Sequence, residues 1–219
     1  MATIREIADA VKTGKKKVVT ALVQEALDAG TTAAEILNEG LVTGMNELGE
    51  MFKNGEVYVP EVLVAARAMK AGTEMIKPLL QEENVQAKGV AAIGTVRGDL
   101  HDIGKNLVGM MLEGKGFTVI DLGVDVTPEM YIDAIKNQGA QIIGISALLT
   151  TTMPNMQACV EEIKKAGLRD KVRIMIGGAP VNQAFCDQIG ADGYTDDAAS
   201  ASDLAVELVK QLGGTVMSI

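Results

Sequence analysis

The chain has 219 residues, of which 47% are hydrophobic, 22% are charged and only 3% are aromatic. This length allows two small domains or one large domain, and the composition is that of a globular protein with an aliphatic core. The net charge of -9 argues against nucleic acid and anionic membranes as partners, because both require a basic surface.

Targeting and redox signals are weak in this sequence. Residues 1–17 lack the unbroken apolar segment of a signal peptide, and no stretch approaches the roughly 18 apolar residues of a membrane-spanning helix. The two cysteines, Cys159 and Cys186, are too few for a disulfide framework and lack the spacing of a zinc site. We therefore expect a cytoplasmic protein with buried free thiols.

Residues 1–81 carry the pattern of helices throughout. Thr32 and Glu35 form a T-x-x-E capping box, which satisfies free N–H groups at a helix start. Pro60 is tolerated in a first helical turn because its missing N–H has no partner there. After it, apolar residues recur at spacings of four and three, which predicts a buried face in a helical bundle. The stripe comprises Val62, Ala66, Met69, Thr73, Ile76 and Leu80.

A polar stretch at 81–88 predicts a linker, and the pattern changes beyond it. Short apolar runs alternate with helix-length segments, which predicts parallel strands covered on both faces by right-handed crossovers. The expected fold class is α + α/β: a helical bundle over 1–85, then a doubly wound, Rossmann-like domain with a five-stranded parallel sheet over 89–219. The predicted strands are 90–96, 118–122, 141–147, 172–176 and 193–194, and the helices are 104–113, 128–137, 153–165, 181–189 and 202–212.

The single histidine of the chain, His101, follows the first predicted strand directly. Ligands of doubly wound folds bind beyond the carboxyl ends of the strands, so a functional residue is expected here. His101 lies in a D-x-H-x-x-G arrangement with Asp99 and Gly104. In such an arrangement one ring nitrogen binds a metal while the other donates to a carboxylate. Gly98 and Gly104 remove side chains where a planar ligand would approach the backbone.

Other interpretations of this histidine stay open on the residues alone. A lone loop histidine is most often a surface residue, and a catalytic one would need a nucleophile that no serine or cysteine supplies at a signature spacing. A zinc site would need further ligands, and the loop lacks the G-x-G-x-x-G of a dinucleotide site. One histidine does suffice when a macrocycle supplies the other ligands of the metal.

The nine residues GDLHDIGKN, at 98–106, resemble the cobalamin-binding signature of methionine synthase and the corrinoid methyltransferase proteins. Two further motifs of that signature follow in order, each at a predicted strand end: S-x-L-x-T at 146–150 and the pair Gly177 and Gly178. Upstream, Gly44-Met45-Asn46, Phe52 and Val59-Pro60 resemble the helical cap over the cofactor's methyl face. The resemblance runs from about residue 15 to the end of the chain.

This resemblance implies that the chain binds cobalamin or a related corrinoid, such as methylcobalamin, with His101 as the cobalt ligand. Asp99 would hold His101, and Thr152, which replaces the serine of methionine synthase, would hold Asp99 in a catalytic relay. Phe52 and Val59 would shield the methyl group, and Ser146 and Thr150 would hydrogen-bond the buried nucleotide tail of the cofactor. The further residues that the resemblance assigns to the cofactor are Gly98, Leu100, Asp102, Gly104, Leu148, Gly177, Gly178 and Ala198.

Among proteins with this signature, the chain looks like a freestanding methyl carrier rather than a complete enzyme. Such a carrier is loaded by a substrate-specific methyltransferase and unloaded by a second methyltransferase that uses tetrahydrofolate or a thiol such as coenzyme M. A reductive activator completes the set of expected partners. The resemblance implies anaerobic use of methanol, methylamines, betaine or methoxyarenes. The alternatives are a B12-dependent sensor or regulatory protein and a non-corrinoid signalling α/β domain.

Overall fold

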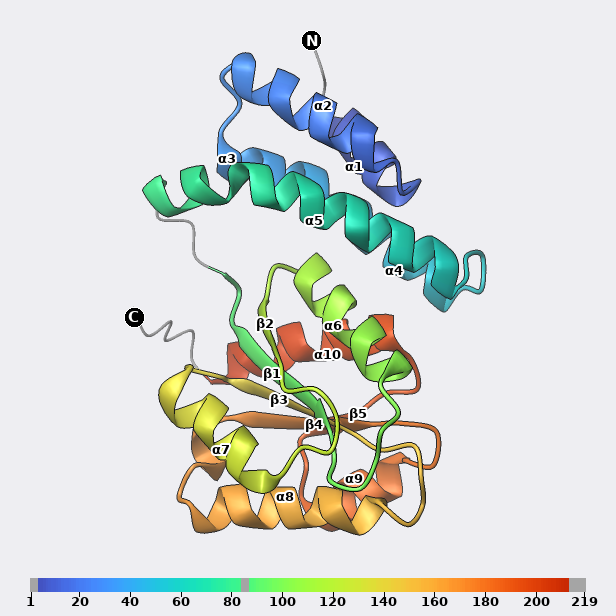
Figure 1. Ribbon diagram of the computed structural model, residues 1–219, viewed down its shortest axis with the longest axis vertical. Helices are drawn as coiled ribbons and strands as arrows, with labels where there is room; N and C mark the ends of the chain where they lie inside the picture. The colour runs from blue at the N-terminus through green and yellow to red at the C-terminus, as the bar shows by residue number, and fades with distance from the viewer. Residues whose placement is uncertain (1–3, 84–86, 213–219) are drawn as a thin grey trace. The chain divides into compact units, whose positions relative to one another are not determined.

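A computed structural model describes residues 4–83 and 87–212, which form two compact units (Figure 1). The first unit is helical, and the second is built on a parallel sheet. Within the described ranges, no helix is long and apolar enough to cross a membrane.

The first unit consists of helices that bury their apolar faces against one another. They are α1 (Ile4–Lys12), α2 (Lys16–Asp28), α3 (Ala33–Glu35), the π-helical segment η1 (Ile36–Val42), α4 (Thr43–Lys53) and α5 (Val59–Glu82). The predicted stripe is confirmed in part: Val62, Met69 and Ile76 are buried. Its other three members, Ala66, Thr73 and Leu80, are only half-buried. The capping box also forms: the Thr32 hydroxyl accepts the Glu35 backbone N–H, and the Glu35 carboxylate accepts the Thr32 N–H.

Two features of this unit differ from the expectation. The helix that begins at the capping box is not regular, because η1 interrupts it with a π-helical stretch. The predicted linker does not begin at residue 81, because α5 continues to Glu82. The Glu83 carboxylate then accepts two backbone N–H groups at the start of α3, each at 3.0 Å. Residues 84–86 of the predicted linker lie outside the described residues.

The second unit is a doubly wound α/β domain, as the alternating pattern predicts. Its strands are β1 (Val90–Thr95), β2 (Thr118–Asp121), β3 (Ile142–Ser146), β4 (Arg173–Gly177) and β5 (Gly193–Tyr194). Its helices are α6 (Ile103–Gly114), α7 (Pro128–Asn137), α8 (Met153–Lys165), the 3-10 turn η2 (Arg169–Lys171), α9 (Gln183–Ile189) and α10 (Ala198–Gln211). The strands are parallel in the order β2-β1-β3-β4-β5, which places the topological switch point between β1 and β3.

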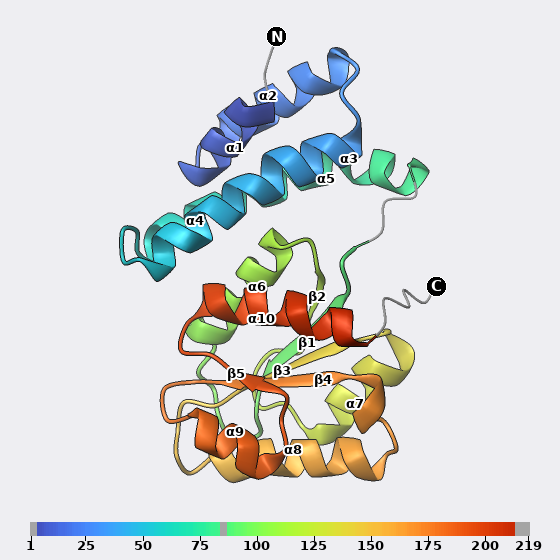
Figure 2. The ribbon, with the colours of Figure 1, turned by 180° about the vertical axis from the view of Figure 1, so that it is seen from behind.

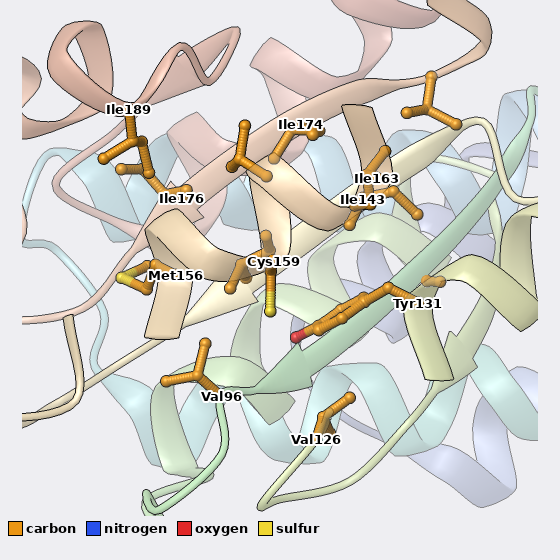
Figure 3. Packing of buried hydrophobic residues seen from close by; sticks show 14 of the residues in the cluster. Val96, Val126, Tyr131, Ile143, Met156, Cys159, Ile163, Ile174, Ile176 and Ile189 are labelled. Atoms are coloured by element: carbon orange, nitrogen blue, oxygen red, sulfur yellow. The ribbon is translucent and has the colours of Figure 1, made fainter. Parts of the chain in front are cut away.

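Each face of the sheet is covered by its own apolar cluster. Helices α6 and α10 lie on one face and α7, α8 and α9 on the other, as Figures 1 and 2 show from opposite sides. The cluster under α7 and α8 contains Tyr131, Met156 and Cys159 (Figure 3), and the cluster under α6 and α10 contains Leu112 and Leu208. Burial on both faces explains the nearly continuous apolar runs of the strands.

Candidate functional site

His101 lies in the loop between β1 and α6, beside the topological switch point. The carboxylate of Asp99 is fully buried, whereas the His101 side chain is 51% exposed. One Asp99 oxygen lies 2.7 Å from Nδ1 of His101 and also accepts the His101 backbone N–H at 3.1 Å. These contacts orient the ring and leave Nε2 as the nitrogen able to bind a metal.

The second oxygen of Asp99 is held by the loop that follows β3. It accepts the backbone N–H groups of Leu148 and Leu149 at 2.8 and 3.2 Å and the Thr152 hydroxyl at 2.8 Å. Burial raises the pKa of the Asp99 carboxyl, but the hydrogen bonds from His101, Leu148 and Thr152 outweigh it and hold the pKa well below its ordinary value. Asp99 is therefore a buried, ionised acceptor at neutral pH.

Three further side chains hold the backbone of the His101 loop. Asp125, between β2 and α7, accepts the Gly98 N–H at 2.7 Å. Asn155 of α8 donates to a loop carbonyl at 2.7 Å, and Thr95 at the end of β1 donates to the His101 carbonyl at 2.9 Å. Sequence reasoning missed all three, because a short polar side chain near a strand end is common in every loop of this fold. Their position at the carboxyl ends of the strands was the one available signal.

Exposed apolar side chains flank His101. Leu100 and Ile103, on either side of it in the sequence, are 72% and 78% exposed, and Leu148 and Leu149 are 42% and 41% exposed. In the described part of this unit, the remaining exposed large hydrophobic residue is Met130. Exposed apolar surface gathered beside one polar group is typical of a ligand-binding site.

Glycines leave room along the same edge of the sheet. Apart from the adjoining backbone, a Cβ added to Gly104 or to Gly177 would meet no atom within 4 Å. Gly178 has a different role: its φ is 124°, and a Cβ there would lie 1.8 Å from the Ala147 carbonyl oxygen, so only glycine fits. The open space, the apolar surface and the half-exposed imidazole fit a bulky, flat macrocycle whose metal would take Nε2 of His101 as a ligand.

The other predicted site residues lie along this edge or in the first unit. Asp102 accepts a hydrogen bond from the neighbouring Asn106 side chain at 3.1 Å. Phe52 in α4 and Val59 in α5 are half-buried in the first unit. Among the residues that the structure describes, no group of three or more His, Cys, Asp or Glu side chains could hold a metal ion. The remaining residues are Ser146 at the end of β3, Thr150 in the loop after it and Ala198 at the start of α10.

The fold and the His101 loop together define a cobalamin-binding protein, and comparisons with known proteins agree. Residues 89–202 match a family model described as a B12 binding domain, and residues 3–77 match a second model with the same description. The chain belongs to the B12-binding corrinoid proteins of methyltransferase systems.

Corrinoid proteins match this chain over most of its length. The chain is 45% identical over 207 residues to dimethylamine corrinoid protein 1 of Methanosarcina acetivorans, which covers 94% of this chain and 97% of that protein. It is also similar to the solved methanol:cobalamin methyltransferase complex MtaBC from Methanosarcina barkeri, with a TM-score of 0.83, 31% identity and coverage of 94% and 79%. A cobalamin-binding protein from Desulfitobacterium hafniense gives a TM-score of 0.78, 30% identity and coverage of 98% and 100%.

These findings establish the cofactor and the general role of the chain. It binds cobalamin or a related corrinoid. It is a methyl-carrying corrinoid protein of a methyltransferase system, and its partners are methyltransferases.

Proposed function

We propose that the chain receives a methyl group from a substrate-specific methyltransferase and delivers it to a second methyltransferase, whose acceptor is tetrahydrofolate or a thiol such as coenzyme M. The observation that carries this proposal is the Asp99–His101 pair, which is already formed at the topological switch point. A bound corrinoid supplies the cobalt centre that accepts the methyl group and gives it up. A reductive activator, which restores the cobalt to its methyl-accepting oxidation state, belongs to the same proposal.

In this proposal His101 is the protein ligand of cobalt through Nε2. The buried carboxylate of Asp99 favours a proton on Nδ1 and directs the lone pair of Nε2 away from the protein. Thr152 donates to the other carboxylate oxygen and stabilises its charge. The three residues would form a relay that takes up a proton at the His101–Asp99 pair when His101 is free of the metal and gives it up when Nε2 would bind the metal.

The other predicted contacts complete the proposed site. The proposed domains are a helical cap domain over residues 1–85, whose Phe52 and Val59 are assigned to the methyl group, and a cobalamin-binding domain over residues 89–219. The half-burial of Phe52 and Val59 and the open space at Gly104 and Gly177 support these roles. Contacts to the corrin ring or the nucleotide tail are assigned to Gly98, Leu100, Asp102, Gly104, Ser146, Leu148, Thr150, Gly177, Gly178 and Ala198.

Methylated amines are the substrate class that we propose for the first methyltransferase. The chain is 45% identical to the dimethylamine corrinoid protein of Methanosarcina acetivorans, and 46% identical over 180 residues to trimethylamine corrinoid protein 2 of Methanosarcina mazei. The second of these covers 81% of this chain and 83% of that protein. The match to the methanol complex is lower, at 31%, so an amine system is favoured.

The cobalt ligand is tested by the visible spectrum of the purified chain reconstituted with hydroxocobalamin, beside His101→Ala. We expect stoichiometric binding and a spectrum that shifts in the variant as the axial nitrogen is lost. Asp170→Ala, in the exposed η2 turn at the opposite edge of the sheet, is the control and should keep the wild-type spectrum. An unchanged spectrum in His101→Ala would remove His101 as the ligand.

The substrate class is tested separately, by loading the reconstituted protein with purified methyltransferases. We expect methylation with dimethylamine or trimethylamine and the corresponding enzyme, followed by transfer to coenzyme M or tetrahydrofolate when a second methyltransferase is added. Loading by a methanol methyltransferase alone would overturn the amine assignment and leave the carrier role standing. Failure of every acceptor would contradict the carrier role and favour a sensor.

A further inference from the structure

Asp125 has an unusual backbone conformation for its residue type. Its φ is 55°, and among the described residues it is the one non-glycine residue with a positive φ. Aspartate tolerates the left-handed region better than most residues, but such a conformation persists only where surrounding contacts enforce it. The contacts of Asp125 therefore identify what holds it in this conformation.

The neighbouring residue, Val126, anchors Asp125 to the end of β1. Val126 is fully buried in the core and forms a β-bridge with Val96. Its backbone N–H donates to the Thr95 carbonyl at 2.9 Å. Asp125 is thus fixed in place beside the point where the His101 loop leaves the sheet.

From this position Asp125 binds the His101 loop at two points. Its Oδ1 accepts the Gly98 N–H at 2.7 Å, and its own N–H donates to the Asp99 carbonyl at 3.2 Å. The backbone at Gly98 and Asp99 is therefore held from the β2 side. The Asp99 carboxylate is held from the β3 side by Leu148, Leu149 and Thr152.

We propose that Asp125 is a positioning residue for the cobalt ligand. Its hydrogen bonds go to the backbone of Gly98 and Asp99, which carries the imidazole and its carboxylate partner. Preorganisation of this kind lowers the cost of ordering the loop when the ligand binds. The inference rests on the proposed role of His101 as cobalt ligand, and it predicts that the His101–cobalt bond weakens when Asp125 loses its acceptor oxygen.

Two substitutions separate the hydrogen bond from the backbone conformation. Asp125→Gly removes the acceptor but accepts a positive φ without strain, so the fold is retained. Asp125→Asn keeps an acceptor oxygen and also tolerates the left-handed region. Asp170→Ala, distant from the loop in the fold, serves as the control. Urea unfolding of the apoproteins measures whether any variant has lost global stability.

The experiment is electron paramagnetic resonance of the cobalt(II) form of each cobalamin-loaded protein, prepared with unlabelled or ¹⁵N-labelled histidine. An axial ¹⁴N ligand splits the cobalt lines into triplets and a ¹⁵N ligand into doublets. Because His101 is the only histidine, a triplet that becomes a doublet on labelling reports the His101–cobalt bond. The benzimidazole nitrogen of the cofactor stays unlabelled and cannot give this change.

In the wild-type protein and in Asp125→Asn we expect the label-dependent doublet. In Asp125→Gly the ratio of unligated to His101-ligated cobalt should rise about tenfold, the scale expected for one lost hydrogen bond to a charged group. A wild-type ratio in Asp125→Gly would overturn the proposal for Asp125. A wild-type spectrum that does not respond to the label would instead overturn the proposed ligand, so the two failures are distinguishable.

If Asp125→Gly does not retain cobalamin, amide hydrogen exchange of the apoprotein tests whether Asp125 holds the His101 loop. The Gly98 N–H should exchange faster in Asp125→Gly than in the wild type, while amides in the core of β3 keep their protection. Unchanged protection of the Gly98 N–H would contradict the role of Asp125.

Discussion

One carboxylate oxygen of Asp99 accepts two hydrogen bonds from His101, from Nδ1 at 2.7 Å and from the backbone N–H at 3.1 Å. Because the two residues are two positions apart, this contact is a local turn of the kind that aspartate forms with the backbone that follows it. The other carboxylate oxygen is bound by residues about fifty positions away. The ring orientation thus depends both on a short motif and on the packing of two strands.

Thr152→Val should destabilise the second unit by about 1.5–3 kcal/mol, because it removes a hydrogen bond to a buried, ionised carboxylate. Asp99 is fully buried and Thr152 is 6% exposed, so water cannot replace the hydroxyl easily. Thr152→Ser keeps the hydroxyl and is the matched control. Urea unfolding of the apoproteins measures the difference, and equal stability of the Val and Ser variants would contradict the assigned hydrogen bond.

Helix bounds are predicted well where the sequence has a regular apolar period and a clear start signal. The bounds of α7 and α8 coincide with the predicted segments, since each begins with a proline in its first turn and has a clear apolar period. Helix α10 begins at Ala198 rather than at the predicted Ser202. Its first turns are small residues without periodicity, and its start is set by Asp197, whose side chain accepts the Ser200 N–H at 2.8 Å.

In the candidate site, too, some contacts could be predicted from the sequence and others could not. The proximity of Asp99 and His101 could be predicted from their shared motif after β1, whereas Thr152 was assigned to them by the resemblance to methionine synthase. The backbone N–H groups of Leu148 and Leu149 could not, since a backbone donor carries no signal in residue type. The contacts of Asp125 with the His101 loop could not be predicted either, because they depend on a positive φ that the sequence does not reveal.

Both cysteines should resist thiol reagents in the native protein. Burial raises the pKa of the Cys159 thiol to about 12, and the charge of Glu129 adds to this effect. Burial also raises the pKa of Cys186. Because the thiolate is the reactive form, mass spectrometry after treatment with N-ethylmaleimide at neutral pH should find neither residue modified, whereas the unfolded protein should react at both. Rapid modification of Cys159 in the folded protein would contradict its placement in the core.

Tyr131→Phe should stabilise the second unit by about 1 kcal/mol. The Tyr131 side chain is fully buried, its hydroxyl has no hydrogen-bond partner among the described residues, and the ring points toward Cys159 in the core (Figure 3). An unpaired buried hydroxyl is costly to desolvate, and its replacement by a hydrogen removes that cost. Tyr194→Phe is the matched control, because the Tyr194 hydroxyl donates to Asp196, and it should not stabilise. A lower melting temperature for Tyr131→Phe in calorimetry would indicate a bound partner for its hydroxyl.

Stability of the first unit should fall in acid because of Glu47. Hydrogen bonds from Arg5 and then from Lys12 of α1 lower the pKa of Glu47 from its ordinary value of 4.5 to about 2, and Lys12 Nζ lies 2.8 Å from its carboxylate. Since the folded-state pKa is the lower one, these ion pairs contribute fully above about pH 4.5 and are lost as the pH falls toward about 2.

Calorimetry of the wild type and Glu47→Gln between pH 7 and pH 2.5 measures this contribution. The melting temperature of the variant should lie below that of the wild type at neutral pH, and the two values should converge in acid, where the wild-type carboxyl becomes protonated. Glu74→Gln, at an exposed position of α5, should follow the wild type throughout. A difference that stays constant with pH would show that Glu47 acts through packing alone, because a lost ion pair must follow the titration of its carboxyl.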